Sequence, residues 1–78
     1  MNFTETQKEL LFNAWLFARD GHGQVVTDDA IPDAHDLAEL GWLERRFNGD
    51  EMSWWWTPQA ERALDVNALI STASAAVN

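Results

Sequence analysis

The sequence predicts a small α+β domain in which helices pack against a two- or three-stranded antiparallel sheet. Two stretches, residues 4–20 and 32–40, repeat apolar residues at the spacing of a helix. Two runs rich in aromatic residues, within residues 42–56, flank Asn48-Gly49, and this dipeptide is a strong short-range signal for a β-hairpin. Helices on both sides of one hairpin give the α+β class.

The composition limits both the size of the core and the class of partner. A chain of 78 residues forms one domain, which we place at residues 1–70, and we expect the small, polar residues 71–78 to fray. Thirteen acidic and five basic residues give a net charge of −8, which repels phosphate backbones and attracts basic surfaces. The absence of Cys excludes disulfides and thiolate chemistry.

The first helix is predicted to begin near residue 4. Thr4 with Gln7, or equally Thr6 with Glu9, has the spacing of a capping box. The helix is predicted to end at the glycines that follow residue 20, Gly21 and Gly23. One apolar stripe of this helix consists of Leu10, Leu11, Ala14, Trp15 and Ala18, while Phe12 and Leu16 lie off it, so the helix is apolar over more than one face. The wider apolar surface is either core or a dimer contact.

A short strand and a helical turn are predicted next. Gln24–Thr27 contains two adjacent β-branched residues, Val25 and Val26, which favour a strand that pairs with the hairpin. Thr27 together with Asp28 and Asp29 then offers helix caps.

The second helix is predicted to run from Pro32 to Leu40. Pro32 suits the first helical position because its missing N–H would have no partner there, and Gly41 suits the residue after the end. Helical spacing places three carboxylates on the outward face, those of Asp33, Asp36 and Glu39. Ala34, Leu37 and Ala38 face inward.

Alternation along the hairpin divides its side chains between two faces. One face holds Leu43, Arg45, Phe47, Met52, Trp54 and Trp56, and the other holds Trp42, Glu44, Arg46, Ser53 and Trp55. We expect Trp54 and Trp56 to lie in the core. Trp55, with Trp42 beside it, either packs within the domain or anchors a partner, because Trp is a preferred residue at the centre of interfaces.

The last helix is predicted to begin at Pro58 with Thr57 as its cap. Its apolar residues are expected to return to the core, and they are Ala60, Ala63, Leu64, Ala68, Leu69 and Ile70.

Residues 37–64 resemble part of a known family. The run L-x-x-L-G-W-L-E-R-R, followed after the hairpin by W-T-P-x-A-x-x-A-L, resembles the recognition helix, wing and exit helix of winged helix-turn-helix proteins of the MarR and PadR kind. The resemblance implies that Pro32–Leu40 enters the major groove of DNA and that Arg45 and Arg46 serve in the wing. It also implies a DNA-binding regulator, which we keep as the alternative: a homodimer that uses Arg45, Arg46, Lys8 and Arg19.

The charge of the second helix favours a different function. A helix that reads DNA usually presents Arg, Lys, Asn or Gln, whereas this one presents carboxylates. We therefore expect a non-catalytic protein that binds a basic protein partner, one that handles nucleic acid, through Asp33, Asp36, Glu39, Trp42 and Trp55. In size and charge the chain resembles inhibitors made by phages and mobile elements, such as anti-CRISPR proteins and polymerase inhibitors. A structural subunit of a larger assembly is a third possibility.

No pattern in the sequence indicates catalysis, a metal or a cofactor. His22 and His35 lack a spaced third ligand, and there is no nucleophile elbow, phosphate loop or zinc-protease motif. No apolar stretch approaches a membrane span, and no basic and apolar leader begins the chain. We expect a cytoplasmic protein that is not an enzyme.

Overall fold

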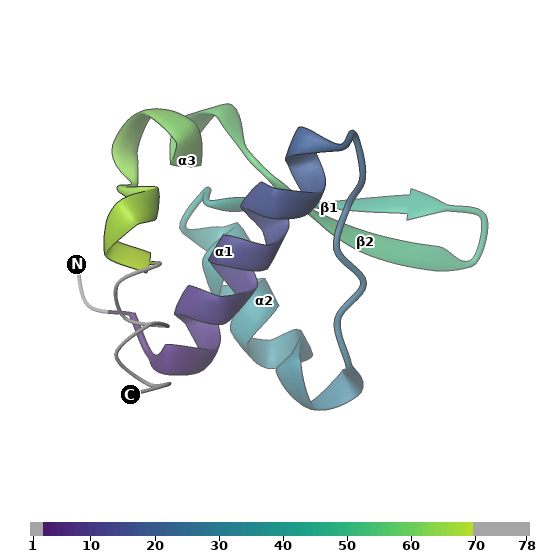
Figure 1. Cartoon of the computed structure of the whole chain (residues 1–78). Coiled ribbons are helices and arrows are strands. Elements are labelled where there is room, and N and C mark those ends of the chain that lie inside the picture. Colours follow the sequence, from purple (N-terminus) through teal and green to yellow (C-terminus); the bar gives the residue numbers. More distant parts are fainter. Residues whose placement is uncertain (1–2, 70–78) are drawn as a thin grey trace.

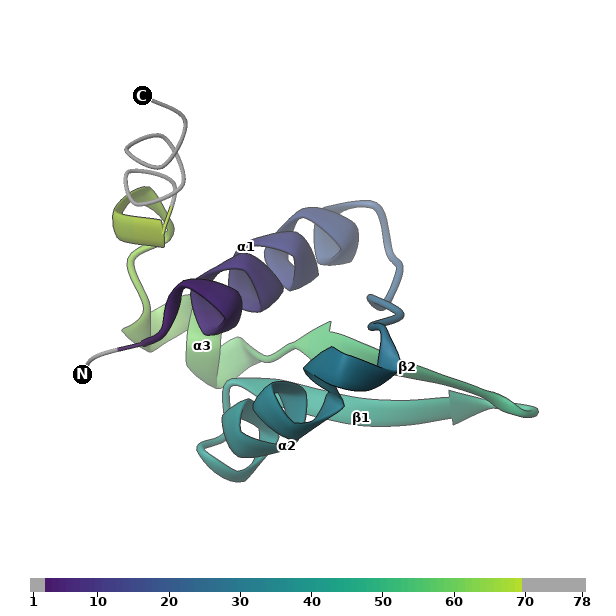
Figure 2. The same ribbon diagram turned by 90° about the horizontal axis from the view of Figure 1, so that it is seen from below.

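The structure is a computed structural model that describes residues 3–69, and it confirms the predicted α+β class (Figure 1). The elements in chain order are α1 (Glu5–Arg19), the 3₁₀ turn η1 (Asp28–Ala30), α2 (Ile31–Glu39), β1 (Leu43–Asn48), β2 (Glu51–Trp56) and α3 (Pro58–Ala63). Figures 1 and 2 show the base of the hairpin packed beside α1 and α2, while its turn projects away from the helices.

Helix α1 begins with the capping box of Thr4 and Gln7, the first of the two predicted pairs. The Gln7 backbone N–H donates to Thr4 Oγ1 at 3.1 Å, and the Thr4 N–H donates to Gln7 Oε1 at 3.0 Å. The helix ends as predicted, because Gly21 adopts a φ of 79° and lets the His22 N–H donate back to the Phe17 carbonyl at 2.9 Å.

The strand predicted at Gln24–Thr27 is reduced to one antiparallel bridge between Gln24 and Trp54. The Gln24 N–H donates to the Trp54 carbonyl at 2.9 Å, and the Trp54 N–H donates to the Gln24 carbonyl at 2.8 Å. The buried Gln24 side chain donates to the Leu10 carbonyl of α1 at 3.0 Å. One residue thus joins β2 to α1, and Val25 beyond it is 62% exposed.

Helix α2 differs from the prediction by one residue at each end, and its last residue is Glu39 rather than Leu40. Ile31 rather than Pro32 is its first residue, because the predicted short helical turn, η1, leads directly into it. Gly41, with a φ of 90°, follows the last turn as expected, and the Trp42 N–H donates to the Leu37 carbonyl at 3.0 Å. The chain then enters β1 with almost no connecting residues.

The hairpin has the predicted faces but a different turn. Asn48 pairs with Glu51, so the two central residues of the turn are Gly49 and Asp50 rather than Asn48-Gly49. Gly49 alone needs a positive φ, 65°, which suits a glycine at the first central position and lets Asn48 remain in the strand. The register confirms the predicted alternation, because Arg45 lies opposite Trp54.

The core lies where α1, α2 and the base of the hairpin meet. Its buried apolar residues are Leu10, Leu11, Ala14, Ala34, Leu37, Trp42, Leu43, Trp54, Ala60 and Leu69. Trp54 is fully buried, as predicted, whereas Trp56 is only half-buried. Of the residues in β1, only Leu43 is buried, because the remainder of the strand extends past the helices.

The chain after Thr57 departs from the single last helix that was predicted. The Thr57 hydroxyl caps α3 as expected, accepting from the Ala60 N–H at 3.0 Å. Leu64, however, is extended, and the Asp65 carboxylate accepts from the Asn67 N–H at 3.0 Å before a further helical turn over residues 66–69. An Asp side chain offers the backbone this alternative to a continuous helix.

Two of the predicted core residues of this segment are exposed as a result. Ala63 and Ala68 face solvent, while Ala60 and Leu69 reach the core. The predictions for Ile70 and for the tail, residues 71–78, lie outside the described residues.

Replacing Trp54 by Ala should lower the free energy of unfolding by about 3–5 kcal/mol, because it removes the largest fully buried side chain and leaves a cavity. Phe47→Ala, on the exposed part of the same face, should change it by less than about 0.5 kcal/mol. Urea unfolding followed by circular dichroism measures both values. Equal losses for the two variants would contradict this description of the core.

Candidate partner-binding surfaces

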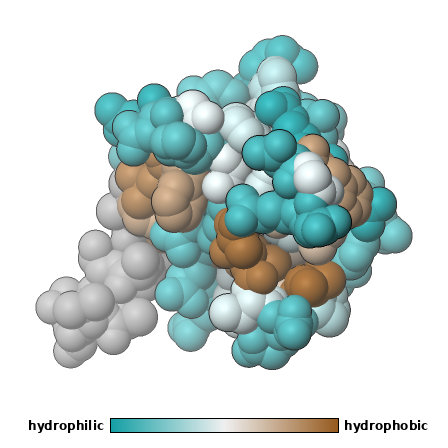
Figure 3. All heavy atoms as spheres, turned by 90° about the vertical axis from the view of Figure 1, so that its right-hand side faces the viewer, coloured by the Kyte–Doolittle hydropathy of each residue, from teal (hydrophilic) through white to brown (hydrophobic). Residues whose placement is uncertain are grey.

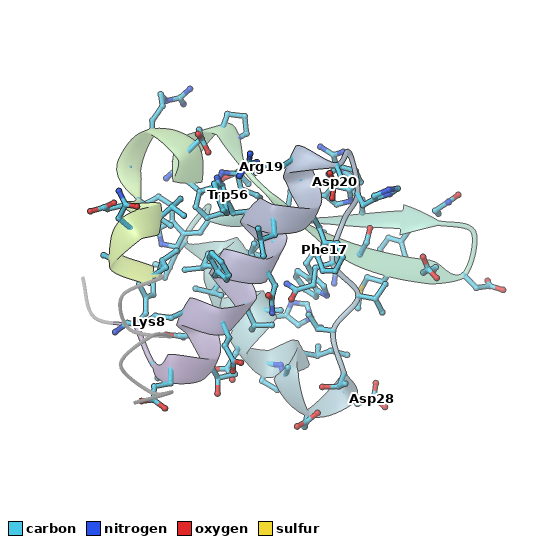
Figure 4. All side chains as sticks on the ribbon, in the orientation of Figure 1. Lys8, Phe17, Arg19, Asp20, Asp28 and Trp56 are labelled. Atoms are coloured by element: carbon cyan, nitrogen blue, oxygen red, sulfur yellow. The ribbon has the colours of Figure 1, made fainter. Side chains whose placement is uncertain are left out.

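The first candidate surface is the acidic face of η1 and α2. Its carboxylates are those of Asp28, Asp29, Asp33, Asp36 and Glu39. Four of the five residues are exposed and Asp33 is half-buried, and within residues 3–69 none of these carboxylates is in an ion pair. Figure 4 shows Asp28 at the periphery of the molecule, beside the beginning of α2.

A local hydrogen bond reinforces the charge at one end of this face. The Thr27 side chain beside Asp29 lowers the pKa of the Asp29 carboxyl below its ordinary value, with help from the backbone N–H of Asp29. Asp29 therefore keeps its negative charge to a lower pH than an isolated Asp would. The acidic face carries uncompensated charge at neutral pH.

Trp42 is not available to a partner, which corrects the prediction made for it. It precedes β1 rather than lying within it, is only 7% exposed and belongs to the core. The tight turn at Gly41 directs the chain inward at this point, so alternation along the strand does not apply to Trp42. Of the two Trp residues expected on the outer face of the hairpin, only Trp55 is found there.

Trp55 is half-buried and is held from three directions. Its Nε1 donates to Ser53 Oγ at 2.9 Å, and the Arg46 guanidinium lies 4.3 Å from the centre of its ring. Its indole also lies against Gly23, at which an added Cβ would overlap the ring. Arg46 in turn pairs with Glu44 at 3.2 Å. The exposed part of Trp55 is therefore fixed in position, as a partner anchor requires.

The two arginines of the hairpin are both directed toward aromatic rings. Arg46 lies over Trp55, and the Arg45 guanidinium lies 5.4 Å from the centre of the Phe47 ring on the opposite face. Such cation–π contacts compete with binding to phosphate. The two cations that the alternative function assigns to DNA thus lie on opposite faces of the hairpin.

The structure also shows an open hollow of about 340 Å³ that the sequence did not reveal. It is lined by Trp15, Ala18, Arg19, Trp56 and Glu61. Figure 4 shows Arg19 beside Trp56, and the Trp56 Nε1 donates to Glu61 Oε2 at 2.7 Å. In the sequence only Trp15 gave an indication of this hollow, because its apolar side chain belongs to the wide apolar surface of the first helix.

Large apolar side chains are exposed in several places. Figure 3 shows apolar atoms among hydrophilic ones on the face toward which the hairpin turn projects. In the described chain the exposed large hydrophobic residues are Leu16, Phe17, Val25, Leu40 and Phe47. On the wide apolar surface of α1, Leu16 is 40% exposed, whereas Phe12 is half-buried and stacks on Trp15.

Two further findings concern residues 3–69. No group of three or more His, Asp or Glu side chains is placed so that it could hold a metal ion. None of the helices in this part of the chain has the length and the apolar content needed to cross a bilayer.

Replacing Gly23 by Ala should displace Trp55, because the added methyl group would occupy the position of its indole. We expect a shift in tryptophan fluorescence and a loss of about 1–3 kcal/mol of stability, the usual cost of overpacking. Ser53→Ala, which removes the hydrogen bond to Trp55 and the longer one, 3.5 Å, that the Ser53 hydroxyl donates to the Arg46 carbonyl, is the comparison and should cost about 1 kcal/mol. A fluorescence spectrum unchanged by Gly23→Ala would show that Trp55 is not held against Gly23.

Comparison of the chain with protein-family models, with curated proteins and with solved structures found no match.

Proposed function

We propose that this chain is a non-catalytic binding protein whose acidic face docks on a basic protein, one that handles nucleic acid. The observation that carries the proposal is the face of η1 and α2, on which no carboxylate is in an ion pair with any residue from 3 to 69. A net charge of −8 adds long-range attraction to a basic surface and raises the rate of encounter.

The acidic face supports protein binding better than DNA binding. Duplex DNA carries a negative charge about every 1.7 Å along its axis, so a helix bearing Asp36 and Glu39 would meet strong repulsion in the major groove. The same charges would be attracted to the basic cleft in which a nucleic-acid enzyme or binding protein holds its substrate. Occupying that cleft would inhibit the partner, which is the role we propose.

We propose that the hairpin corresponds to the wing of a winged helix. In this proposal the chain keeps the architecture of that family as a scaffold. The order helix, helix, hairpin, helix supports this assignment, and so does the bridge that joins Gln24 to the outer side of β2. In this proposal Trp55 is an apolar anchor on the hairpin, since half-buried, prearranged Trp residues contribute strongly at interfaces.

The double variant Asp36→Lys/Glu39→Lys should weaken binding to the basic partner at least about tenfold, because it replaces attraction by repulsion at the centre of the face. Asp33 is left intact because it is half-buried in the first turn of α2. The partner is first isolated with the immobilised wild-type protein and then purified, and its dissociation constant is measured by titration calorimetry.

The matched control is Glu9→Lys/Asp20→Lys, which changes the net charge by the same amount at two exposed positions of α1 and its end. It should reduce affinity only slightly, through the long-range field. Equal losses for the two double variants would show that net charge alone, and not the face of α2, governs binding.

Labelled random duplex DNA should not bind the purified protein, even at about 20 mM salt, where phosphate contacts are strongest. Fluorescence anisotropy from about 20 to 200 mM salt measures this. Binding that weakens steeply with salt would reject the proposal and favour the regulator that uses Arg45 and Arg46.

A further inference from the structure

We propose that the hollow between α1, β2 and α3 binds a free amino acid with an aromatic side chain. Of the described residues that line it, Trp15, Ala18 and Arg19 come from α1, Trp56 from the end of β2 and Glu61 from α3. Its volume of about 340 Å³ lies at the lower end of the range of ligand pockets, so it suits a small molecule. None of these residues belongs to the acidic face, and the proposal does not depend on the proposed function.

Two indoles supply the apolar surface of the hollow. Trp15 and Trp56 are both half-buried, so each keeps part of its ring accessible. Contacts within the domain hold both rings in place. Trp15 stacks on Phe12 with 5.9 Å between the ring centroids, and Trp56 Nε1 donates to the Glu61 carboxylate at 2.7 Å. Prearranged rings favour an aromatic side chain as the ligand, because aromatic pairs attract one another beyond the gain from burying their surface.

One cation and one anion reach the hollow without pairing with each other. The Arg19 guanidinium lies 4.9 Å from the centre of the Trp15 ring, and within residues 3–69 it is in no ion pair. A guanidinium that lies over a ring still has N–H groups to offer, since it carries five donors.

The anion is Glu61, which is exposed and is likewise in no ion pair in the described part of the chain. Its carboxylate accepts a hydrogen bond from Trp56 Nε1. A carboxylate has about four acceptor positions, so Glu61 can accept from a ligand as well.

The two charges select the class of ligand. An anion without a cationic group would be repelled by Glu61 and by the net charge of −8. A cation without an anionic group would lie beside Arg19 and leave it unpaired. A ligand with both a carboxylate and an ammonium group avoids both costs, and the two indoles add the preference for an aromatic ring. A free aromatic amino acid meets all three conditions, whereas a residue inside a peptide carries neither charge on its backbone.

Titration of the full chain with L-phenylalanine tests the proposal. Each Trp gives one indole N–H signal in spectra that correlate ¹H with ¹⁵N, and single replacements of Trp by Phe assign these signals. The signals of Trp15 and Trp56 should move and saturate with a dissociation constant between about 10 µM and 1 mM, as expected of an open site with few contacts. Those of Trp42 and Trp54, which are buried in the core, should stay in place.

If neither Trp15 nor Trp56 responds up to about 10 mM L-phenylalanine, the proposal is overturned and the proposed function is unaffected.

Three analogues separate the two charges from the ring. Phenylalanine amide lacks the carboxylate, N-acetylphenylalanine lacks the ammonium group, and glycine lacks the ring. Each should bind at least about tenfold more weakly than L-phenylalanine, because each loses one of the three contacts. Equal affinity for L-phenylalanine and the two blocked forms would show that the rings alone attract the ligand, which contradicts the proposal.

Two variants locate the charges. Arg19→Gln should weaken L-phenylalanine about tenfold but change phenylalanine amide by less than about threefold, since the amide has no carboxylate to lose. Glu61→Gln should likewise weaken L-phenylalanine about tenfold and leave N-acetylphenylalanine within about threefold. The new Gln still offers an oxygen to Trp56 Nε1. Equal losses for all ligands would mean that the two residues act only on the structure, and the assignment of charges would fail.

Ala18→Leu should abolish binding, because the larger side chain fills the hollow while Arg19 and Glu61 stay in place. The matched controls are Asp20→Asn and Arg62→Gln, which each remove a charge at an exposed neighbour of Arg19 or Glu61 that does not line the hollow. Both should keep the dissociation constant within about threefold of the wild type. Circular dichroism confirms that every variant is folded. If Ala18→Leu binds like the wild type, the ligand lies elsewhere and the proposal is wrong.

Discussion

The structure depends on the burial of one side chain, that of Trp54. Its ring is fully buried, its backbone pairs with Gln24, and its ring makes a T-shaped contact with the His35 ring of α2, with 5.0 Å between the centroids. Gln24 in turn bonds to the Leu10 carbonyl of α1. Hairpin, α1 and α2 are thus connected through a single residue, and a chain of this size has few others large enough to take that role.

Burying the Trp54 ring costs free energy because its N–H loses its hydrogen bond to water. The free energy gained by removing the apolar surface of the ring from water is larger. The Nε1 atoms of Trp54 and Trp42 are buried, and neither has a hydrogen-bond partner within residues 3–69. An unsatisfied buried donor costs about 1–3 kcal/mol. Burying about 150–250 Å² of a large aromatic side chain contributes roughly 4–6 kcal/mol at about 25 cal/mol per Å². The apolar term is larger, so the two indoles remain in the core.

The aromatic content of the hairpin also shapes the charge that the molecule presents. Trp55 and Phe47 hold the guanidinium groups of Arg46 and Arg45 on opposite faces of the sheet. Arg46 is further paired with Glu44, whereas within residues 3–69 neither Asp36 nor Glu39 of α2 is in an ion pair. The result is an α2 surface whose carboxylates have no ion-pair partner within residues 3–69, next to a hairpin whose two cations already contact aromatic rings. That asymmetry, rather than the fold, distinguishes one binding function from another.

The sequence by itself determined the elements whose signals are local. The left-handed Gly41 after α2 and the two-residue period of the hairpin each involve neighbours along the chain, so spacing was enough to predict them, while for the capping box spacing narrowed the choice to two pairs, of which the structure shows Thr4 with Gln7. The outward position of Asp36 and Glu39 follows from helical periodicity in the same way.

Only the tertiary structure decided features that depend on distant contacts. The strand at Gln24–Thr27 shrank to one bridge, Trp42 entered the core, and Trp55 was placed against Gly23, a residue far away in the sequence. The hollow beside Arg19 joins three elements and has no local pattern. Propensity and periodicity describe a segment alone, whereas burial depends on which other segments cover it, and that information appears only when the chain has folded.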